Sequence, residues 1–266
     1  MTDNEAELLV EQVLNAYCEK APVDLGRIAR EEGIELVEGD FGDDFHGRLE
    51  FLRDVGTFAL YHPRIATARY PGRVRFSIAH ELAHYFIESH REGIINGLFH
   101  NSDEGFRSLS EIEKEADRVA SALLIPAKTI KSTMGSRNFL SLKQLLDLAN
   151  RCEASVQATA FRYARFAEEA CLAVVSSCSR ILYAFASDEA DGLGFKFLGI
   201  KDVPPGSATQ RASNSSVTEI FEGPTDTSCW FSWRLRSAEL WEEAVRLGST
   251  SLVLTLLSWK SDEVED

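Results

Sequence analysis

Two histidines and a glutamate within one short stretch have the types and the spacing of a hydrolytic metal site. His80, Glu81 and His84 form the pattern His-Glu-x-x-His. On a helix, residues four positions apart lie on one face, so both imidazole rings can bind a single ion. Glu81 then faces the open coordination position and can take a proton from a metal-bound water. Zinc suits this chemistry, because imidazole and carboxylate bind it and hydrolysis needs no redox step.

The plain alternative is a surface helix that carries two solvated histidines. With 6 histidines in 266 residues, the pattern would arise by chance in roughly 1% of such chains. The opposite face of the same helix also argues against a solvated surface helix, because it is apolar and built to lie in a core. The apolar residues of that face are Phe76, Ile78, Ala79, Leu82, Ala83, Phe86 and Ile87.

A second, acidic helix is predicted over residues 109–124, and it can supply the third ligand. A site with two histidines needs another protein ligand, and a glutamate from a following helix is a common solution. Glu113 is the preferred candidate, while Glu111 and Asp117 are competing choices. Asp117 lies one turn beyond Glu113 and can accept the second ring N–H of a liganding histidine, which fixes its tautomer. Alternatively, Glu113 forms a capping box with Ser110. Glu113 and Asp117 would then be ordinary solvated carboxylates.

Together the two stretches resemble the ImmA/IrrE family of metallopeptidases. Residues 75–84 read Arg-Phe-Ser-Ile-Ala-His-Glu-Leu-Ala-His. A Glu-Lys-Glu-Ala-Asp string starts at Glu113, and Leu-Leu-Ile-Pro follows at 123–126. Both strings occur in this order in that family. The resemblance implies an α+β fold with a gluzincin-like metallopeptidase domain.

The resemblance also implies a site and a function. The zinc ligands of the family fall on His80, His84 and Glu113, and the general base falls on Glu81. Manganese or iron(II) can occupy the same ligands. Family members cleave a helix-turn-helix (XRE-type) repressor and thereby release genes of a stress response, such as a DNA damage response, or of a mobile element. The implied partner is therefore a repressor protein.

Charge and composition limit the other classes of function. The net charge of −14 argues against non-specific binding to nucleic acid or to an anionic membrane, and suits a basic protein partner. The sequence shows no signal peptide and no apolar run of membrane-spanning length. The 5 cysteines form no Cys-x-x-Cys pair, which is typical of reduced thiols. We expect a cytoplasmic protein.

The first of three expected domains is the metallopeptidase domain, residues 1–133. Helices are predicted over 6–19 and 25–32, the second with Asp24 as its N-cap. Strands are predicted over 34–37, 47–52 and 57–61. The strand 57–61 is the candidate sheet edge to which an extended peptide could add. The stretch 89–108 between the catalytic helices is either a lid or a plain connection.

A helix-turn-helix segment is expected over 134–171, and a GAF-like regulatory domain over 172–266. Helices at 141–152 and 156–169 have the spacing of a DNA-binding unit in outline. Basic and acidic residues cancel there, although Arg162 and Arg165 could reach phosphate, so DNA binding is not expected. In the last domain, strands are predicted at 172–176, 180–185, 229–233 and 251–259, with a short helix or loop at 240–246. A domain of this kind could bind a small-molecule effector.

Some roles stay open at this level. A peptidase must stabilise an oxyanion, and the motif names no residue for that task. His46, His62, His90 and His100 are each interpreted as ordinary residues. The competing function is a non-catalytic transcription regulator that uses the metal-bearing domain as a binding surface.

Overall fold

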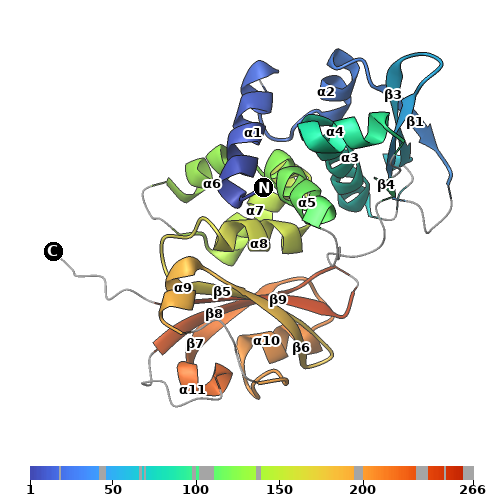
Figure 1. The fold of residues 1–266 in the computed structure, drawn as a ribbon. Coiled ribbons are helices and arrows are strands. Elements are labelled where there is room, and N and C mark those ends of the chain that lie inside the picture. The colour runs from blue at the N-terminus through green and yellow to red at the C-terminus, as the bar shows by residue number, and fades with distance from the viewer. Residues whose placement is uncertain are drawn as a thin grey trace. The chain divides into compact units, whose positions relative to one another are not determined.

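The computed structural model describes residues 1–17, 19–41, 46–65, 68, 70–97, 100–101, 111–135, 139–194, 200–231, 239–248 and 250–259. The chain divides into two compact units. The first contains Met1–Thr129 and Asn150–Ser155, and the second contains Ile130–Ala149 and Val156–Asp266. Helices and a small sheet are followed by a five-stranded antiparallel sheet, so the expected α+β class is confirmed (Figure 1).

The chain opens with two capped helices. In α1 (Asp3–Ala16), Thr2 and Glu5 form a capping box. In α2 (Leu25–Glu31), the Asp24 side chain accepts a hydrogen bond from the Arg27 amide over 2.8 Å, as predicted. Such caps satisfy N–H groups that have no partner within the helix.

The carboxylate of Glu32 connects the ends of three helices through hydrogen bonds. Glu32 follows α2 directly. Its carboxylate accepts a hydrogen bond from the hydroxyl of Tyr17, which ends α1. It also accepts one over 2.8 Å from the hydroxyl of Tyr85, which lies near the end of α3 (Pro71–Phe86). Burial and the nearby Glu32 carboxylate raise the pKa of Tyr17 to about 12. Both hydroxyls therefore remain donors at neutral pH.

The small sheet of the first unit has the strand order β1-β3-β2-β4. Its strands are β1 (Glu35–Gly39), β2 (Arg48–Leu52), β3 (Thr57–Pro63) and β4 (His100–Asn101). The prediction that 57–61 forms a sheet edge is wrong, because β3 pairs with β1 on one side and β2 on the other. Phe58, Ala59 and Leu60 are all buried, which is the pattern of a central strand covered on both faces.

Helix α3 carries the His-Glu-x-x-His motif and begins at Pro71. Proline is favoured in the first turn of a helix, and Arg73 and Arg75 lie within the helix that follows. The stretch 89–108 is not simply a loop, since most of α4 (Glu88–Ile95) and strand β4 lie in it. Helix α5 (Glu111–Leu124) follows, and α3 packs against it. Ser110, the candidate cap of α5, lies outside the described residues.

Three further helices precede the large sheet. They are α6 (Ala127–Met134), α7 (Leu142–Cys152) and α8 (Val156–Ala164), the last shorter than predicted. Arg162 is only 2% exposed, and its guanidinium lies over the Phe166 ring at 4.9 Å from the ring centroid. It is therefore not available to bind phosphate. The assignment of this region as a helix-turn-helix segment stays a prediction.

The second unit contains an antiparallel sheet with the order β6-β5-β9-β8-β7. The strands are β5 (Cys171–Ser177), β6 (Arg180–Ala186), β7 (Ile220–Asp226), β8 (Glu239–Arg246) and β9 (Leu252–Trp259). The helices of this part are α9 (Asp188–Gly192), α10 (Ala208–Asn214) and α11 (Thr227–Trp230). The GAF-like assignment stays a prediction.

Two local predictions for the second unit are wrong. Residues 240–246, expected as a helix or loop, form most of β8, which pairs with both β7 and β9. A strand is predicted over 229–233, and of these residues the structure describes 229–231. Instead Thr227–Trp230 is a short helix, because the Asp226 side chain caps it by accepting from the Ser228 amide over 2.7 Å. In the described part of the chain, no helix is long and apolar enough to cross a membrane.

Candidate metal centre

Three side chains from α3 and α5 converge on one point in the first unit. His80 Nε2 lies 3.1 Å from His84 Nε2 and 3.0 Å from Glu113 Oε2. His84 Nε2 lies 3.7 Å from the same Glu113 oxygen. The structure thus brings together the three residues proposed as ligands, and their donor atoms all lie within 4.8 Å of one another.

This spacing fits a tetrahedral zinc ion. Zinc–ligand bonds of roughly 2.0–2.1 Å in tetrahedral geometry place ligand atoms about 3.3 Å apart. The separations of 3.0, 3.1 and 3.7 Å bracket that value. His80 and His84 are 3% and 0% exposed, so the site is shielded from water on the helix side. The donor set of two imidazoles and one carboxylate is one that zinc prefers.

Asp117 lies behind the first histidine, as the sequence predicts. Its Oδ1 is 2.9 Å from His80 Nδ1, which leaves Nε2 of the same ring directed toward His84 and Glu113. Burial disfavours the charged ring, but the hydrogen bonds to Asp117 and Glu113 outweigh it and raise the pKa of His80 to about 10. A metal ion must therefore displace a proton from this ring when it binds at neutral pH.

The Glu81 side chain is fully buried and held by the sheet. Its Oε2 accepts a hydrogen bond from the backbone N–H of Leu49 in β2 over 2.8 Å. Gly47 lies just before β2, and a Cβ atom at this position would come within 3.2 Å of Glu81 Cγ and 3.3 Å of Oε1. The glycine therefore allows the chain to approach the carboxylate closely. Neither contact is predictable from the motif.

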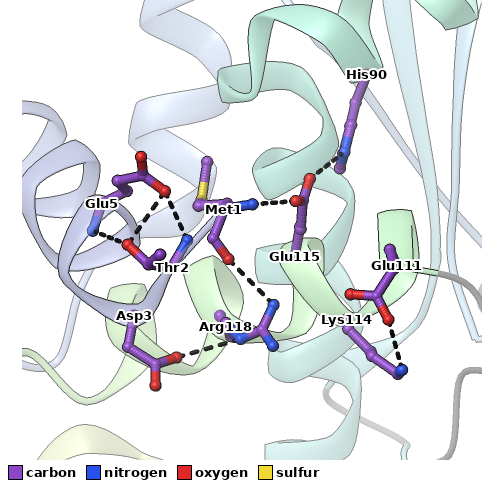
Figure 2. A network of polar contacts seen from close by, with 9 residues as sticks. All are labelled: Met1, Thr2, Asp3, Glu5, His90, Glu111, Lys114, Glu115 and Arg118. Atoms are coloured by element: carbon purple, nitrogen blue, oxygen red, sulfur yellow. Dashed lines mark hydrogen bonds and ion pairs between the residues drawn. The ribbon is translucent and has the colours of Figure 1, made fainter.

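The other acids of α5 are engaged elsewhere. Glu115 lies 3.2 Å from His90 Nε2 and also contacts the amino group of Met1 (Figure 2). Glu111 pairs with Lys114 at 2.7 Å and is exposed, which makes it a poor alternative ligand. Glu113 and Asp117 therefore contact His80, while Glu111 and Glu115 pair with groups outside the proposed ligand set.

His90 lies closer to the site than the sequence suggested. Its ring centroid is 5.1 Å from that of His84, although His90 belongs to α4. The chain turns at Ile87 between the two helices, so helical spacing gave no signal for this contact. Of the other histidines, His46 Nε2 lies 2.8 Å from Arg73 and His62 Nδ1 lies 2.9 Å from the carbonyl oxygen of Pro63. The side chain of His100 lies outside the described residues.

Comparisons with known proteins give a family for this chain and a solved structure of similar fold. The chain matches the family model described as the IrrE N-terminal-like domain, a peptidase family, over residues 29–163, just over half of its length. A solved structure described as a Mycobacterium tuberculosis transcriptional regulator has a similar fold. It gives a TM-score of 0.61 at 13% identity, over 96% of this chain and 76% of that chain. The comparison with curated proteins returns no match.

The family match includes both helices of the site and the small sheet beside them. The resemblance seen in the sequence is thereby confirmed. The chain belongs to the family of the IrrE N-terminal-like domain and carries a metallopeptidase-like domain.

Proposed function

We propose that this protein is a zinc-dependent endopeptidase that cleaves a helix-turn-helix repressor of the XRE type. Cleavage would release stress-response or mobile-element genes from repression. The observation that carries the proposal is the convergence of His80, His84 and Glu113 next to the buried Glu81. Family membership supports a peptidase of this kind.

The residues divide the chemistry between them. His80, His84 and Glu113 would hold the zinc ion, and Asp117 fixes the orientation of His80. Bound zinc supplies a water of lowered pKa and polarises the scissile carbonyl. Glu81 takes a proton from the attacking water and later delivers it to the leaving amine. The hydrogen bond from Leu49 keeps the Glu81 carboxylate in one orientation throughout.

The position of β2 suggests how a substrate peptide binds. Because Leu49 contacts the proposed general base, β2 runs beside the site. Within the described residues, β4 pairs only with Arg48 and Leu49 of β2. Because β4 covers β2 at Leu49, beside Glu81, and is the outermost described strand on this side of the sheet, an extended peptide could add to β4 as a further strand. This assignment replaces β3 as the candidate edge.

The wider assignments belong to the same proposal. We infer a cytoplasmic protein with a metallopeptidase domain at 1–133, a helix-turn-helix segment at 134–171 and a GAF-like domain at 172–266. The net charge of −14 favours a basic protein partner over direct binding to DNA. Manganese or iron(II) could replace zinc at the same ligands.

One observation favours a second function. The structural neighbour is described as a transcriptional regulator, and its likeness extends over 96% of this chain. This chain could therefore regulate transcription without cleavage, by using the metallopeptidase-like domain to bind a partner protein.

A cleavage assay with a co-encoded helix-turn-helix repressor tests the proposal. It compares the native protein, Glu81→Gln, Glu113→Gln and a chelator-treated sample to which zinc is added back. Glu111→Gln is the matched control, because Glu111 is an exposed acid on the same helix as Glu113. We expect cleavage by the native protein, the control and the zinc-restored sample, and a loss of about 10²–10⁴-fold or more in Glu81→Gln.

The same samples separate the two functions. If Glu81→Gln binds zinc and the repressor normally but does not cleave, the peptidase is supported. Repressor binding without cleavage by the zinc-loaded native protein would instead favour the non-catalytic regulator.

A further inference from the structure

The second unit contains a cavity of about 260 Å³ on the face of the sheet that α10 covers. Its walls come from the loop that precedes α10, from β7 and from β8. Pro204, Pro205 and Pro224 supply apolar surface. The volume lies just below the roughly 300–1,000 Å³ typical of pockets for drug-sized ligands, so it suits a smaller molecule.

A buried carboxylate forms part of the wall. Glu242 of β8 is only 1% exposed and lines the cavity. Its Oε1 accepts hydrogen bonds from the Thr209 amide over 2.7 Å and from the Thr209 hydroxyl over 2.6 Å. That hydroxyl has one proton, so the hydroxyl of Thr255, 2.6 Å away, is the donor in the next link. Among the described residues, all hydrogen bonds to the Glu242 carboxylate are therefore accepted by Oε1.

A glycine keeps space open in front of this carboxylate. Gly223 of β7 is the direct cross-strand partner of Glu242, and directly opposed residues of an antiparallel pair lie on the same face. A Cβ at Gly223 would meet a single heavy atom within 4 Å, the Nη2 of Arg211 at 3.6 Å. Any larger side chain at this position would occupy the cavity beside Glu242.

The charges around the cavity favour a cation. Glu242 and Asp226 are acidic, and Arg211 is the basic residue among the lining groups. Arg211 is directed to other partners, because its Nη2 donates to the Glu222 carbonyl oxygen over 2.9 Å and its guanidinium lies over the Phe221 ring. A buried carboxylate is most stable when a charged donor pairs with it.

We propose that this cavity binds a small planar organic cation of the amidinium or guanidinium class. Its N–H groups would donate to Glu242, and its apolar body would lie against the three prolines. The site gives the second unit a ligand of defined chemistry. The proposal does not depend on the peptidase, because every residue in it lies in the second unit.

Binding of benzamidine to the full chain tests the proposal by calorimetry. Benzoate has the same shape and the opposite charge, and serves as the ligand control. Glu242→Gln retains an oxygen that can accept from Thr209 but loses the charge. Gly223→Val fills the cavity with a side chain that strands favour. We expect the Gln variant to weaken benzamidine binding about tenfold or more, since a charge-assisted hydrogen bond is lost.

A second readout places the ligand in the cavity. Cys229 lines the cavity and is exposed, whereas Cys178 is exposed in the turn between β5 and β6. Alkylation of both thiols is followed by peptide mass spectrometry. We expect benzamidine to slow the modification of Cys229 and to leave the rate at Cys178 unchanged. In Gly223→Val this protection should be lost while the thermal midpoint stays near that of the native protein.

Several results would overturn the assignment. They are no binding of benzamidine at millimolar concentration, equal binding of benzoate, equal affinity in Glu242→Gln, or equal protection of Cys178 and Cys229. None of these results bears on repressor cleavage, which tests the first unit alone.

Discussion

The backbone N–H of Leu49 donates a hydrogen bond over 2.8 Å to Oε2 of Glu81. It connects β2 to α3 at the residue proposed as general base, across 32 positions of sequence. A side chain whose orientation is fixed before substrate binds loses less entropy in the reaction. The sheet therefore helps to define the geometry of the site, as well as the stability of the unit.

Gly47→Ala tests the close approach of the chain to Glu81. The added Cβ would lie 3.2 Å from Glu81 Cγ, so the carboxylate must shift by a few tenths of an ångström. We expect kcat/KM for repressor cleavage to fall about tenfold or more, because small misplacements of a catalytic group are costly. Zinc affinity should stay unchanged, since no ligand moves. Gly192→Ala is the control, at the end of α9, where the backbone φ is not positive and a Cβ would meet no atom within 4 Å. Unchanged cleavage by Gly47→Ala would contradict a fixed position for Glu81.

Asp117→Asn tests the hydrogen bond to His80. The variant keeps the shape of the side chain but removes the charge that orients the ring and increases its basicity. Competition with a chromogenic chelator should show zinc affinity lowered by about 10–100-fold. With zinc at saturation, cleavage should recover most of its native rate. A variant with native zinc affinity would show that Asp117 has no role in the metal site.

Zinc should stabilise the native protein and fail to stabilise Glu113→Gln. A ligand that binds only the folded state adds about 4 kcal/mol to the free energy of unfolding at 1,000 times its Kd. Thermal unfolding with and without zinc measures this difference in each variant. Glu111→Gln should respond as the native protein does, since its side chain pairs with Lys114 on the surface. An equal shift in Glu113→Gln would remove Glu113 from the ligand set.

Glu243 makes the stability of the second unit depend on pH. Burial raises the pKa of this carboxyl above its ordinary value of 4.5, although the Leu142 amide that donates to it partly opposes the shift. Ionisation is therefore harder in the folded state. The resulting destabilisation is absent below about pH 4, where Glu243 is protonated in both the folded and the unfolded protein. It is complete once the pH exceeds the raised pKa of Glu243 in the folded protein.

The variant Glu243→Gln should therefore increase the thermal midpoint at pH 7 and have little effect at pH 4. Its amide oxygen can still accept from Leu142. Unfolding is measured at both pH values, with Glu219→Gln, an exposed acid just before β7, as the matched control. A gain in stability of the same size at both pH values would show that the charge of Glu243 is not the cause.

The sequence predicted the elements whose signals are local. Asp24 caps α2 because its side chain reaches an amide three residues away. The motif of α3 could be recognised because helical spacing brings its two histidines together. The prediction for residues 240–246 was wrong because Glu, Leu and Ala favour helices, whereas pairing with both neighbouring strands places this stretch in β8. The central position of β3 likewise depends on a partner, β1, which precedes it in the chain.

The same distinction applies to the site. His80, Glu81 and His84 share one helix, and Glu113 and Asp117 share another, so their faces follow from spacing. The hydrogen bond from Leu49 to Glu81 is donated by a backbone N–H group. Because nearly every residue has such a group, no side-chain pattern in the sequence predicts this contact. The position of His90 beside His84 depends on the angle between α3 and α4, which the sequence does not encode in its periodicity.

The carboxylate of Glu32 joins the ends of α1, α2 and α3, and we expect these ends to open cooperatively. Because Tyr17 and Tyr85 both donate to it, loss of Glu32 removes two long-range contacts at once. The effects of Tyr17→Phe and Tyr85→Phe should therefore be non-additive. Amide hydrogen exchange would detect the same coupling as protection factors at three helix ends that rise and fall together. Local opening of α1 would then loosen the end of α3, one residue beyond His84.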